Sequence, residues 1–226
     1  ALFRLTQLKC LTLLRYDWTQ TASSAVSRLC NLEMLKCSTC NVSRLLDSKE
    51  LYHLTKLKRL ALTNCAVQGR IPSALGRLRS LETLKLLRNC FTGTVPTELG
   101  HLTQLTKFYL GGEYGNREPL TASIPTEIGL LTRMVKLYLF NTLQTGRLPT
   151  EFGRLTNLTE LYFDDTLLLG AIPTEFNLLT NLKCLSIYFK GPLVEPVSPE
   201  VKRAFGKVFS IHVFQLWGSG SPIRVF

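Results

Sequence analysis

The chain has 226 residues, 45% of them hydrophobic, and a formal net charge of +11. This composition excludes an intrinsically disordered chain, because disordered segments have too few apolar residues to form a core. The positive charge favours acidic partners through long-range attraction. A membrane-spanning helix needs roughly 20 apolar residues, and no stretch here reaches that length, so we expect no membrane contact from this segment itself.

A leucine-rich pattern recurs along the chain with a period of about 24 residues. Each copy follows L-x-x-L-x-x-L-x-L, with another apolar residue in place of one leucine in several copies. This pattern at a fixed period of about 20–29 residues indicates a leucine-rich repeat solenoid. We predict an α/β solenoid of about eight repeats over residues 1–190. It should be a right-handed superhelix with a parallel concave β-sheet and short 3₁₀ or α turns on the convex side. The copies open at Leu5, Leu29, Leu54, Leu78, Leu102, Leu131, Leu155 and Leu179.

The L-x-L stretch of each copy alternates apolar residues with outward-facing residues, which is the period of a β-strand. We expect the apolar pair of each copy to face the core, and the residue between them to face solvent on the concave sheet. The pairs are Leu11/Leu13, Leu35/Cys37, Leu60/Leu62, Leu84/Leu86, Phe108/Leu110, Leu137/Leu139, Leu161/Phe163 and Leu185/Ile187.

A second signal, G-x-I/V/L-P, follows most of the strands. Glycine allows a backbone conformation that other residues rarely adopt, and proline removes a backbone donor. The polar stretch after each proline is too short for a full α-helix and predicts a 3₁₀ or single α turn. The signal occurs at Gly69–Pro72, Gly93–Pro96, Gly146–Pro149 and Gly170–Pro173, with Ala122–Pro125 as a variant.

These motifs carry a family resemblance. The G-x-I-P element followed by T-E-L/I/F-G-x-L-T-x-L resembles plant-type leucine-rich repeats, over residues 54–182 closely and over 5–53 loosely. Such repeats occur in receptor-like kinases, receptor-like proteins, polygalacturonase inhibitors and protist arrays. The resemblance implies a recognition role, receptor-like or scaffold. It favours an extracellular or membrane-tethered ectodomain and leaves a cytoplasmic location open.

The resemblance also implies one asparagine per repeat, whose side-chain amide bonds the turn backbone of its neighbours. Only Asn89 keeps that amide here. We expect Tyr16, Glu113 and Lys190 to loosen the turn locally. The residues at this position are Tyr16, Cys40, Cys65, Asn89, Glu113, Thr142, Thr166 and Lys190.

Copy five is longer than the others, because Leu102 and Leu131 are 29 residues apart. Its glycines at 111, 112 and 115 predict a loop over residues 111–120. Insertions in solenoids often lie on the binding face, so we expect this loop to add edge contacts. A tolerated surface loop without a role is the alternative.

The repeat period stops at Gly191, and we predict a C-terminal cap or irregular tail over residues 191–226. Ser198 followed by Pro199 predicts the start of a short helix over Ser198–Phe205. The sequence leaves open whether Val208–Trp217 forms a capping strand.

The outward residues of the concave sheet provide the candidate binding site. Tyr109, Tyr138 and Tyr162 fall on adjacent predicted strands, and exposed aromatic side chains on a rigid surface are typical of binding hot spots. A cross-strand ladder that only stabilises the sheet is the alternative. The full column is Thr12, Lys36, Ala61, Lys85, Tyr109, Tyr138, Tyr162 and Ser186.

Charged residues flank this aromatic stripe. Lys85, Lys107 and Lys136 are expected to steer acidic groups, whereas Glu160 and Asp164 make the later part of the surface acidic. Such a dipolar surface would orient a charged peptide or an acidic glycan. A solvated face of mixed charge is the alternative interpretation.

No motif in the sequence indicates catalysis or metal binding. Cys37 and Cys40 form a C-x-x-C, but zinc needs four ligands and no second close pair exists. We expect buried, inert thiols, although Cys40 and Cys65 occupy one column and a disulfide between them is geometrically allowed. We predict no enzyme, no cofactor and no metal.

The sequence therefore predicts a non-enzymatic module that binds a protein or peptide ligand, with acidic character favoured, on its concave sheet. Two alternatives remain: an inhibitor of a carbohydrate-active enzyme, which the resemblance implies, and a binder of acidic polymers driven by charge. We expect no specific nucleic acid. The oligomeric state and the ligand remain open.

Overall fold

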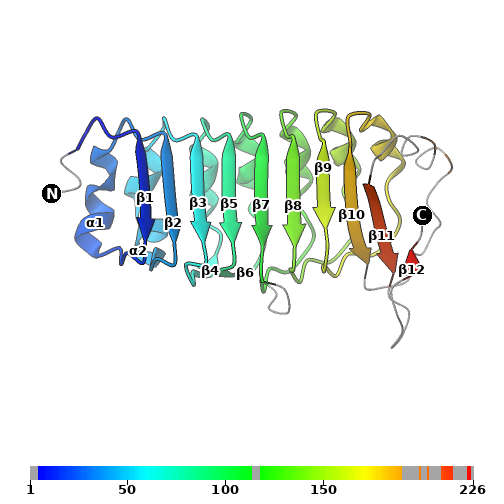
Figure 1. The fold of residues 1–226 in the computed structure, drawn as a ribbon, viewed down its shortest axis with the longest axis horizontal. Helices are drawn as coiled ribbons and strands as arrows, with labels where there is room; N and C mark the ends of the chain where they lie inside the picture. The colour runs from blue at the N-terminus through cyan, green and yellow to red at the C-terminus, as the bar shows by residue number, and fades with distance from the viewer. Residues whose placement is uncertain are drawn as a thin grey trace.

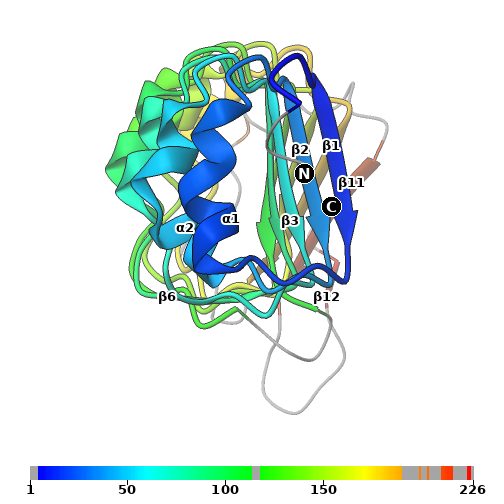
Figure 2. The ribbon, with the colours of Figure 1, turned by 90° about the vertical axis from the view of Figure 1, so that its left-hand side faces the viewer.

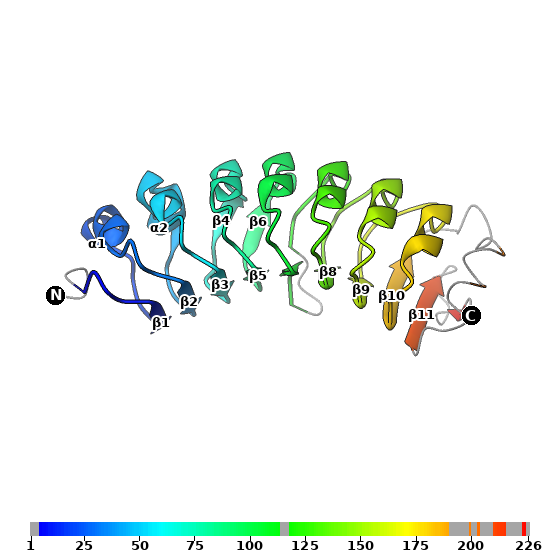
Figure 3. The ribbon, with the colours of Figure 1, turned by 90° about the horizontal axis from the view of Figure 1, so that it is seen from above.

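The structure is a computed structural model that describes residues 5–113, 118–189, 199, 203, 210–215 and 223–224. The chain winds as a curved array of coils, with strands along one side and short helices along the other (Figures 1 and 3). This arrangement is the predicted leucine-rich repeat solenoid.

The concave side is a single sheet. Nine of its strands run parallel to their neighbours among the described residues, and β12 (Ile223–Arg224) is antiparallel to β11. The parallel strands are β1 (Cys10–Leu14), β2 (Met34–Ser38), β3 (Arg59–Thr63), β5 (Thr83–Leu87), β7 (Lys107–Gly111), β8 (Lys136–Phe140), β9 (Glu160–Phe163), β10 (Cys184–Phe189) and β11 (Ser210–Gln215). A second, two-stranded parallel sheet joins β4 (Gln68–Arg70) to β6 (Cys90–Thr92).

Strand β11 extends the sheet beyond the last regular repeat, with Ile211 opposite Leu185. Part of the segment that we predict to be a cap or tail is therefore a parallel strand, whereas the boundary at residue 190 stays a prediction. Most of the predicted helix over Ser198–Phe205 lies outside the described residues. Pro199 and Arg203, which are described, have helical backbone.

The predicted apolar pairs lie in the core, together with the earlier leucines of each repeat and buried residues of the convex side such as Phe91 and Phe152. From Leu35/Cys37 through Leu185/Ile187 both members of every pair are fully buried. The first pair is less enclosed, because Leu13 is only partly buried. Each repeat covers the apolar edge of its neighbours, and one buried leucine contributes about 1.5–3 kcal/mol to stability.

The convex side carries a 3₁₀-helix in each copy that contains the proline signal, as predicted (Figure 2). These are η4 (Ser73–Arg77), η5 (Thr97–His101), η6 (Thr126–Leu130), η7 (Thr150–Arg154) and η8 (Thr174–Leu178). The first two copies lack the signal and form short α-helices with a following 3₁₀ turn. They are α1 (Gln20–Ala25) with η2 (Val26–Arg28), and α2 (Ser43–Asp47) with η3 (Lys49–His53).

A glycine in most 3₁₀-helices lets adjacent repeats approach closely. A Cβ atom on Gly100 would lie 2.8 Å from the backbone oxygen of Glu127, and one on Gly129 would lie 2.6 Å from Cβ of Glu151. Real Cβ atoms do not approach other atoms so closely, so the T-E-x-G motif sets how tightly the convex side packs.

Several of the turns after the strands are held by the side chain in the asparagine column. Lys190, the last member of that column, lies outside the described residues. The Asn89 amide donates to the carbonyls of Leu62 (3.1 Å) and Leu87 (3.0 Å) and accepts from the N–H of Cys65 (3.0 Å). Cysteine takes part of this role one copy earlier, because the Cys65 thiol donates to the Cys37 carbonyl at 3.5 Å. The described cysteines are free thiols, so Cys40 and Cys65 form no disulfide.

Copy five differs from our prediction, which placed Glu113 in this column. Glu113 is instead exposed, 3.9 Å from the guanidinium of Arg88. Glu118 fills the column: it is fully buried and accepts from the N–H groups of Asn89 (2.5 Å) and Phe91 (2.7 Å). The prediction was wrong because the inserted residues lie before the turn-binding side chain and move its position along the chain.

The buried carboxylate of Glu118 gives a test of this assignment. We expect Glu118→Gln to lower the free energy of unfolding by about 1–3 kcal/mol, because one accepting oxygen becomes a donor facing a backbone N–H. Chemical denaturation measures the change. Glu113→Gln is the control, and an exposed change of this kind should stay within about 0.5 kcal/mol. Equal effects of the two variants would contradict the assignment.

Ala122 gives a second test, because it replaces the glycine of the G-x-I-P signal and has φ +64°, in the left-handed region. Ala122→Gly should raise the free energy of unfolding by about 1 kcal/mol, because the left-handed backbone conformation is less favourable for alanine than for glycine. Gly69→Ala is the reverse experiment: its φ is +86° and an added Cβ meets nothing within 4 Å. It should destabilise the protein through the backbone alone. A shift of both variants in the same direction would refute this explanation.

Candidate functional site

Three tyrosines form a continuous surface on the concave sheet. Tyr109 on β7, Tyr138 on β8 and Tyr162 on β9 lie directly opposite one another in the register. The ring centroids of Tyr109 and Tyr138 are 4.9 Å apart, and those of Tyr138 and Tyr162 are 4.3 Å apart. The rings are tilted against each other, a geometry that aromatic pairs prefer to face-to-face stacking because of their charge distribution. All three side chains are half-buried, and we call them the tyrosine platform.

Hydrogen bonds fix the orientation of two of these rings. The Tyr138 hydroxyl donates to the Glu160 carboxylate, and the Tyr162 hydroxyl lies 2.8 Å from the Cys184 thiol. Burial and the Glu160 carboxylate raise the pKa of Tyr138 well above its usual value. The contact with Cys184, together with burial, raises the pKa of Tyr162 to about 12. The platform is therefore uncharged at neutral pH.

The three predicted steering lysines have different environments. The ammonium group of Lys85 lies 4.6 Å from the centroid of the Tyr109 ring, a cation–π contact. Lys107 is exposed on β7. Lys136 instead pairs with Glu160 at 2.6 Å. Within the described part of the chain, only Lys85 and Lys107 of this group have no carboxylate partner.

The two predicted acidic residues are also engaged in contacts. The hydrogen bond from Lys136, and to a smaller extent that from Tyr138, holds the pKa of Glu160 below its usual value. The hydrogen bond to Glu160 in turn raises the pKa of Lys136. Asp164 accepts from the Ser186 hydroxyl at 2.7 Å. The structure thus brings Glu160 into one network with the platform and Lys136, whereas Asp164 contacts the next strand.

Sequence reasoning missed two residues beside the platform. Phe140 is half-buried on β8, two residues after Tyr138 and on the same face of the sheet. Cys184 lies opposite Glu160 in the register. Both could have been found by reading every outward column of the strands, because strand side chains alternate with a period of two.

The ends of the insertion in copy five lie next to the platform strands. The N–H groups of Gly112 (3.3 Å) and Glu118 (2.8 Å) both donate to the carbonyl of Asn141, just after β8. Residues 114–117 lie outside the described part of the structure. The predicted edge contacts of the 111–120 loop therefore stay a prediction.

Among the described residues, no group of three His, Cys, Asp or Glu side chains could hold a metal ion. The helices in that same part of the chain are too short to cross a bilayer.

Comparison with known proteins places this geometry in context. No protein-family model matches the sequence. Protein TOO MANY MOUTHS of Arabidopsis thaliana is 46% identical over 70 residues, which cover 30% of this chain and 14% of that protein. Receptor-like protein 41 of the same plant is 36% identical over 91 residues, covering 38% of this chain and 10% of the relative. The chain thus matches only a small part of each relative's length.

Among solved structures, the chain is similar to the leucine-rich repeat ectodomain of the Arabidopsis thaliana receptor kinase GASSHO1/SCHENGEN3. The TM-score is 0.76 at 27% identity, and the match covers 94% of this chain and 26% of that ectodomain. The resemblance to plant-type leucine-rich repeat proteins is thereby confirmed. Receptor ectodomains of this type are non-enzymatic binding modules.

The contact between Lys136 and Glu160 can be tested by titration. Lys136→Met should raise the pKa of Glu160 toward its usual value, because the hydrogen bond from Lys136 is the main cause of its depression. NMR of the carboxyl carbon measures this pKa. Lys107→Met, which removes only a weaker charge effect, should shift it less. A larger shift in the Lys107 variant would contradict the pairing.

The same contact predicts a pH dependence. Because the pKa of Glu160 is lower in the folded state, its contribution to stability is present above the usual carboxyl pKa of about 4.3 and is lost as pH falls through the folded value. As pH falls through that acidic range, the Lys136→Met variant should therefore lose less stability than the unmodified chain. Thermal unfolding at a series of pH values measures this loss.

Proposed function

We propose that this chain, a leucine-rich repeat solenoid of the plant receptor type, binds a peptide or protein segment on its concave sheet, with the tyrosine platform as the apolar anchor. The observation that carries the proposal is the run of three tyrosine rings in contact on adjacent strands. These rings are held by a buried leucine core and are accessible along their outer side.

Aromatic residues on such a scaffold are suited to binding. A tyrosine has few rotatable bonds, so it loses little entropy when a ligand covers it, and here the neighbouring rings restrict it in advance. The core pairs of these strands are fully buried and lie on the face of the sheet opposite to the tyrosines. Ligand binding therefore explains tyrosines on three adjacent strands better than stabilisation of the sheet alone does.

The charges beside the platform favour one ligand orientation. Lys85 and Lys107 are not neutralised by carboxylates in the described structure, whereas Lys136 and Glu160 neutralise each other. An acidic group of the ligand would lie toward β5 and β7, and its apolar part would cover Tyr138 and Tyr162. Charge complementarity of this kind sets orientation and association rate more than affinity.

A relative supports the recognition role. The GASSHO1/SCHENGEN3 ectodomain was solved in complex with CASPARIAN STRIP INTEGRITY FACTOR 2. This chain corresponds to 26% of that ectodomain, so the similarity supports a ligand-binding module without indicating the same ligand.

The proposal can be tested with a ligand selected for the purpose. A peptide display library is panned against the immobilised chain, and the affinity of the selected peptide is measured by calorimetry. The triple variant Tyr109→Ala, Tyr138→Ala, Tyr162→Ala should bind at least about 30-fold more weakly, because loss of a hot spot costs about 2 kcal/mol or more. Circular dichroism should show that the fold is retained.

Leu130→Ala with Leu178→Ala is the matched control, because these leucines are exposed on the convex side at 49% and 54%. This variant should bind as the unmodified chain does. Unchanged affinity of the tyrosine variant would refute the site. Binding without sequence preference and with a steep salt dependence would indicate a charge-driven binder of acidic polymers instead.

A further inference from the structure

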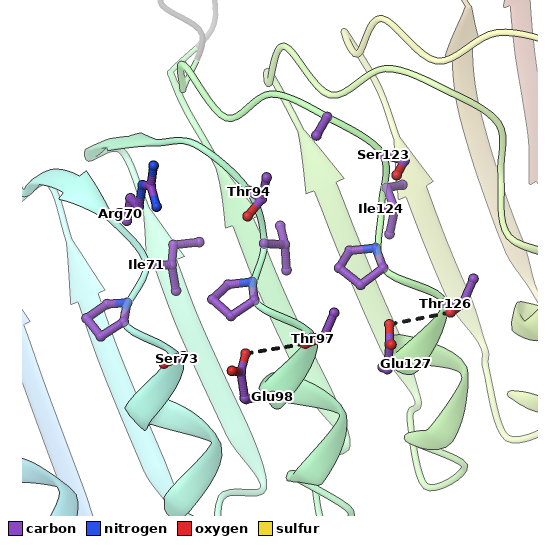
Figure 4. Close-up of a pocket in the computed structure, with 15 residues that line it drawn as sticks. Arg70, Ile71, Ser73, Thr94, Thr97, Glu98, Ser123, Ile124, Thr126 and Glu127 are labelled. Atoms are coloured by element: carbon purple, nitrogen blue, oxygen red, sulfur yellow. Dashed lines mark hydrogen bonds between the residues drawn. The ribbon is translucent and has the colours of Figure 1, made fainter.

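A second concavity lies away from the tyrosine platform, where the G-x-I/V-P segments lead into the 3₁₀-helices. It has a volume of about 700 Å³ and crosses three consecutive repeats (Figure 4). We call it the lateral groove. One rim carries Arg70, Thr94 and Ser123, and the opposite rim carries the helix starts with Glu98 and Glu127. Between the rims lie Ile71 and Ile124. Val95 and the prolines Pro72, Pro96 and Pro125 also line the groove.

The backbone of this groove has unused hydrogen-bonding groups. The carbonyls of Pro96 and Pro125 each accept an N–H from their own 3₁₀-helix at 3.2 Å. For Thr94–Val95 and Ser123–Ile124, by contrast, no backbone hydrogen bond is formed within the described part of the chain. Backbone N–H and C=O groups without partners are the groups that an added extended segment can pair with.

The groove also carries negative charge that the protein leaves unpaired. Elsewhere on the surface, Glu33 is 2.9 Å from Lys58 and Glu160 is 2.6 Å from Lys136. Glu98 and Glu127 have no lysine or arginine partner among the described residues, and each accepts only from the preceding threonine hydroxyl, at 3.4 Å. Two unpaired carboxylates on adjacent repeats make this rim locally negative on a chain whose net charge is +11, and it is this local charge that suits the rim to a basic partner.

Arg70 does not neutralise these carboxylates. Its aliphatic part lies along Gly93, since a Cβ atom on that glycine would be 3.3 Å from Cγ of Arg70. Figure 4 shows Arg70 on the rim opposite Glu98 and Glu127. The groove therefore separates a donor on one side from acceptors on the other, with an apolar strip between them.

We propose that the lateral groove binds an extended segment of a partner protein that carries basic side chains at every second or third residue. An extended chain advances about 3.3 Å per residue, so basic residues at every second or third position are about 6.6–10 Å apart. The glutamates lie on the outer side of the curved array, where adjacent repeats are farther apart than the roughly 4.8 Å between strands (Figure 3), so this spacing would match one basic residue to each glutamate. The free backbone groups position the segment, and the carboxylates select its charge. The site is separate from the tyrosine platform and does not depend on its function.

The test uses a fluorescein-labelled octapeptide of alternating lysine and threonine, and fluorescence anisotropy with the full chain. The double variant Glu98→Gln, Glu127→Gln should weaken binding at least 10-fold. The matched control is Glu151→Gln with Glu175→Gln, which removes equivalent glutamates from η7 and η8, outside the groove. The control should change affinity less than threefold. An octapeptide of alternating glutamate and threonine should not bind.

A second variant tests the shape of the site without changing its charge. Ser123→Trp places a large side chain on the exposed rim and should block the lysine peptide. Three results would overturn the proposal: no binding of the lysine peptide to the unmodified chain, equal weakening by both glutamate pairs, or full binding by the Ser123 variant. Loss of binding only in the triple tyrosine variant would place the peptide on the concave sheet and would also overturn it.

Discussion

The structure depends on the burial of one apolar pair per strand between two neighbouring copies. No repeat can cover its own leucines, so neighbouring strands must lie side by side and in register, as Leu60, Leu84 and Phe108 do on β3, β5 and β7. This constraint also determines the outer surface. Once the inward pairs are in register, the residues between them line up across the concave face, and three tyrosines from separate copies meet ring to ring.

The same stacking explains the features at the two sides of the sheet. On the convex side, glycines such as Gly100 allow the next repeat to approach within a distance that a Cβ atom would prevent. At three consecutive turns, Cys65, Asn89 and Glu118 bond the backbone of the preceding repeat. An insertion is tolerated in copy five because Glu118 restores that bond after the extra residues.

The period predicted the sheet, the core pairs, the 3₁₀-helices and the alignment of the tyrosines, because all of these follow from spacing along the chain. Spacing alone could not identify Glu118, because the insertion leaves open whether Glu113 or Glu118 occupies the asparagine column. It also could not show that Lys136 and Glu160 pair, because that contact depends on side-chain geometry between β8 and β9. The lateral groove likewise depends on which backbone groups remain unpaired after folding.

The two surfaces have different chemistry: an aromatic concave face beside free lysines, and a lateral groove beside free glutamates. The central claim is that the tyrosine platform binds the ligand. NMR of the tyrosine rings during titration with the peptide selected by display tests this claim most directly, because it reports on each ring separately. The account predicts that the ring signals of Tyr109, Tyr138 and Tyr162 shift, while those of Tyr16 and Tyr52, which lie in the first copies, do not. Shifts confined to Tyr16 or Tyr52, or no shift in the three platform rings at saturation, would contradict it.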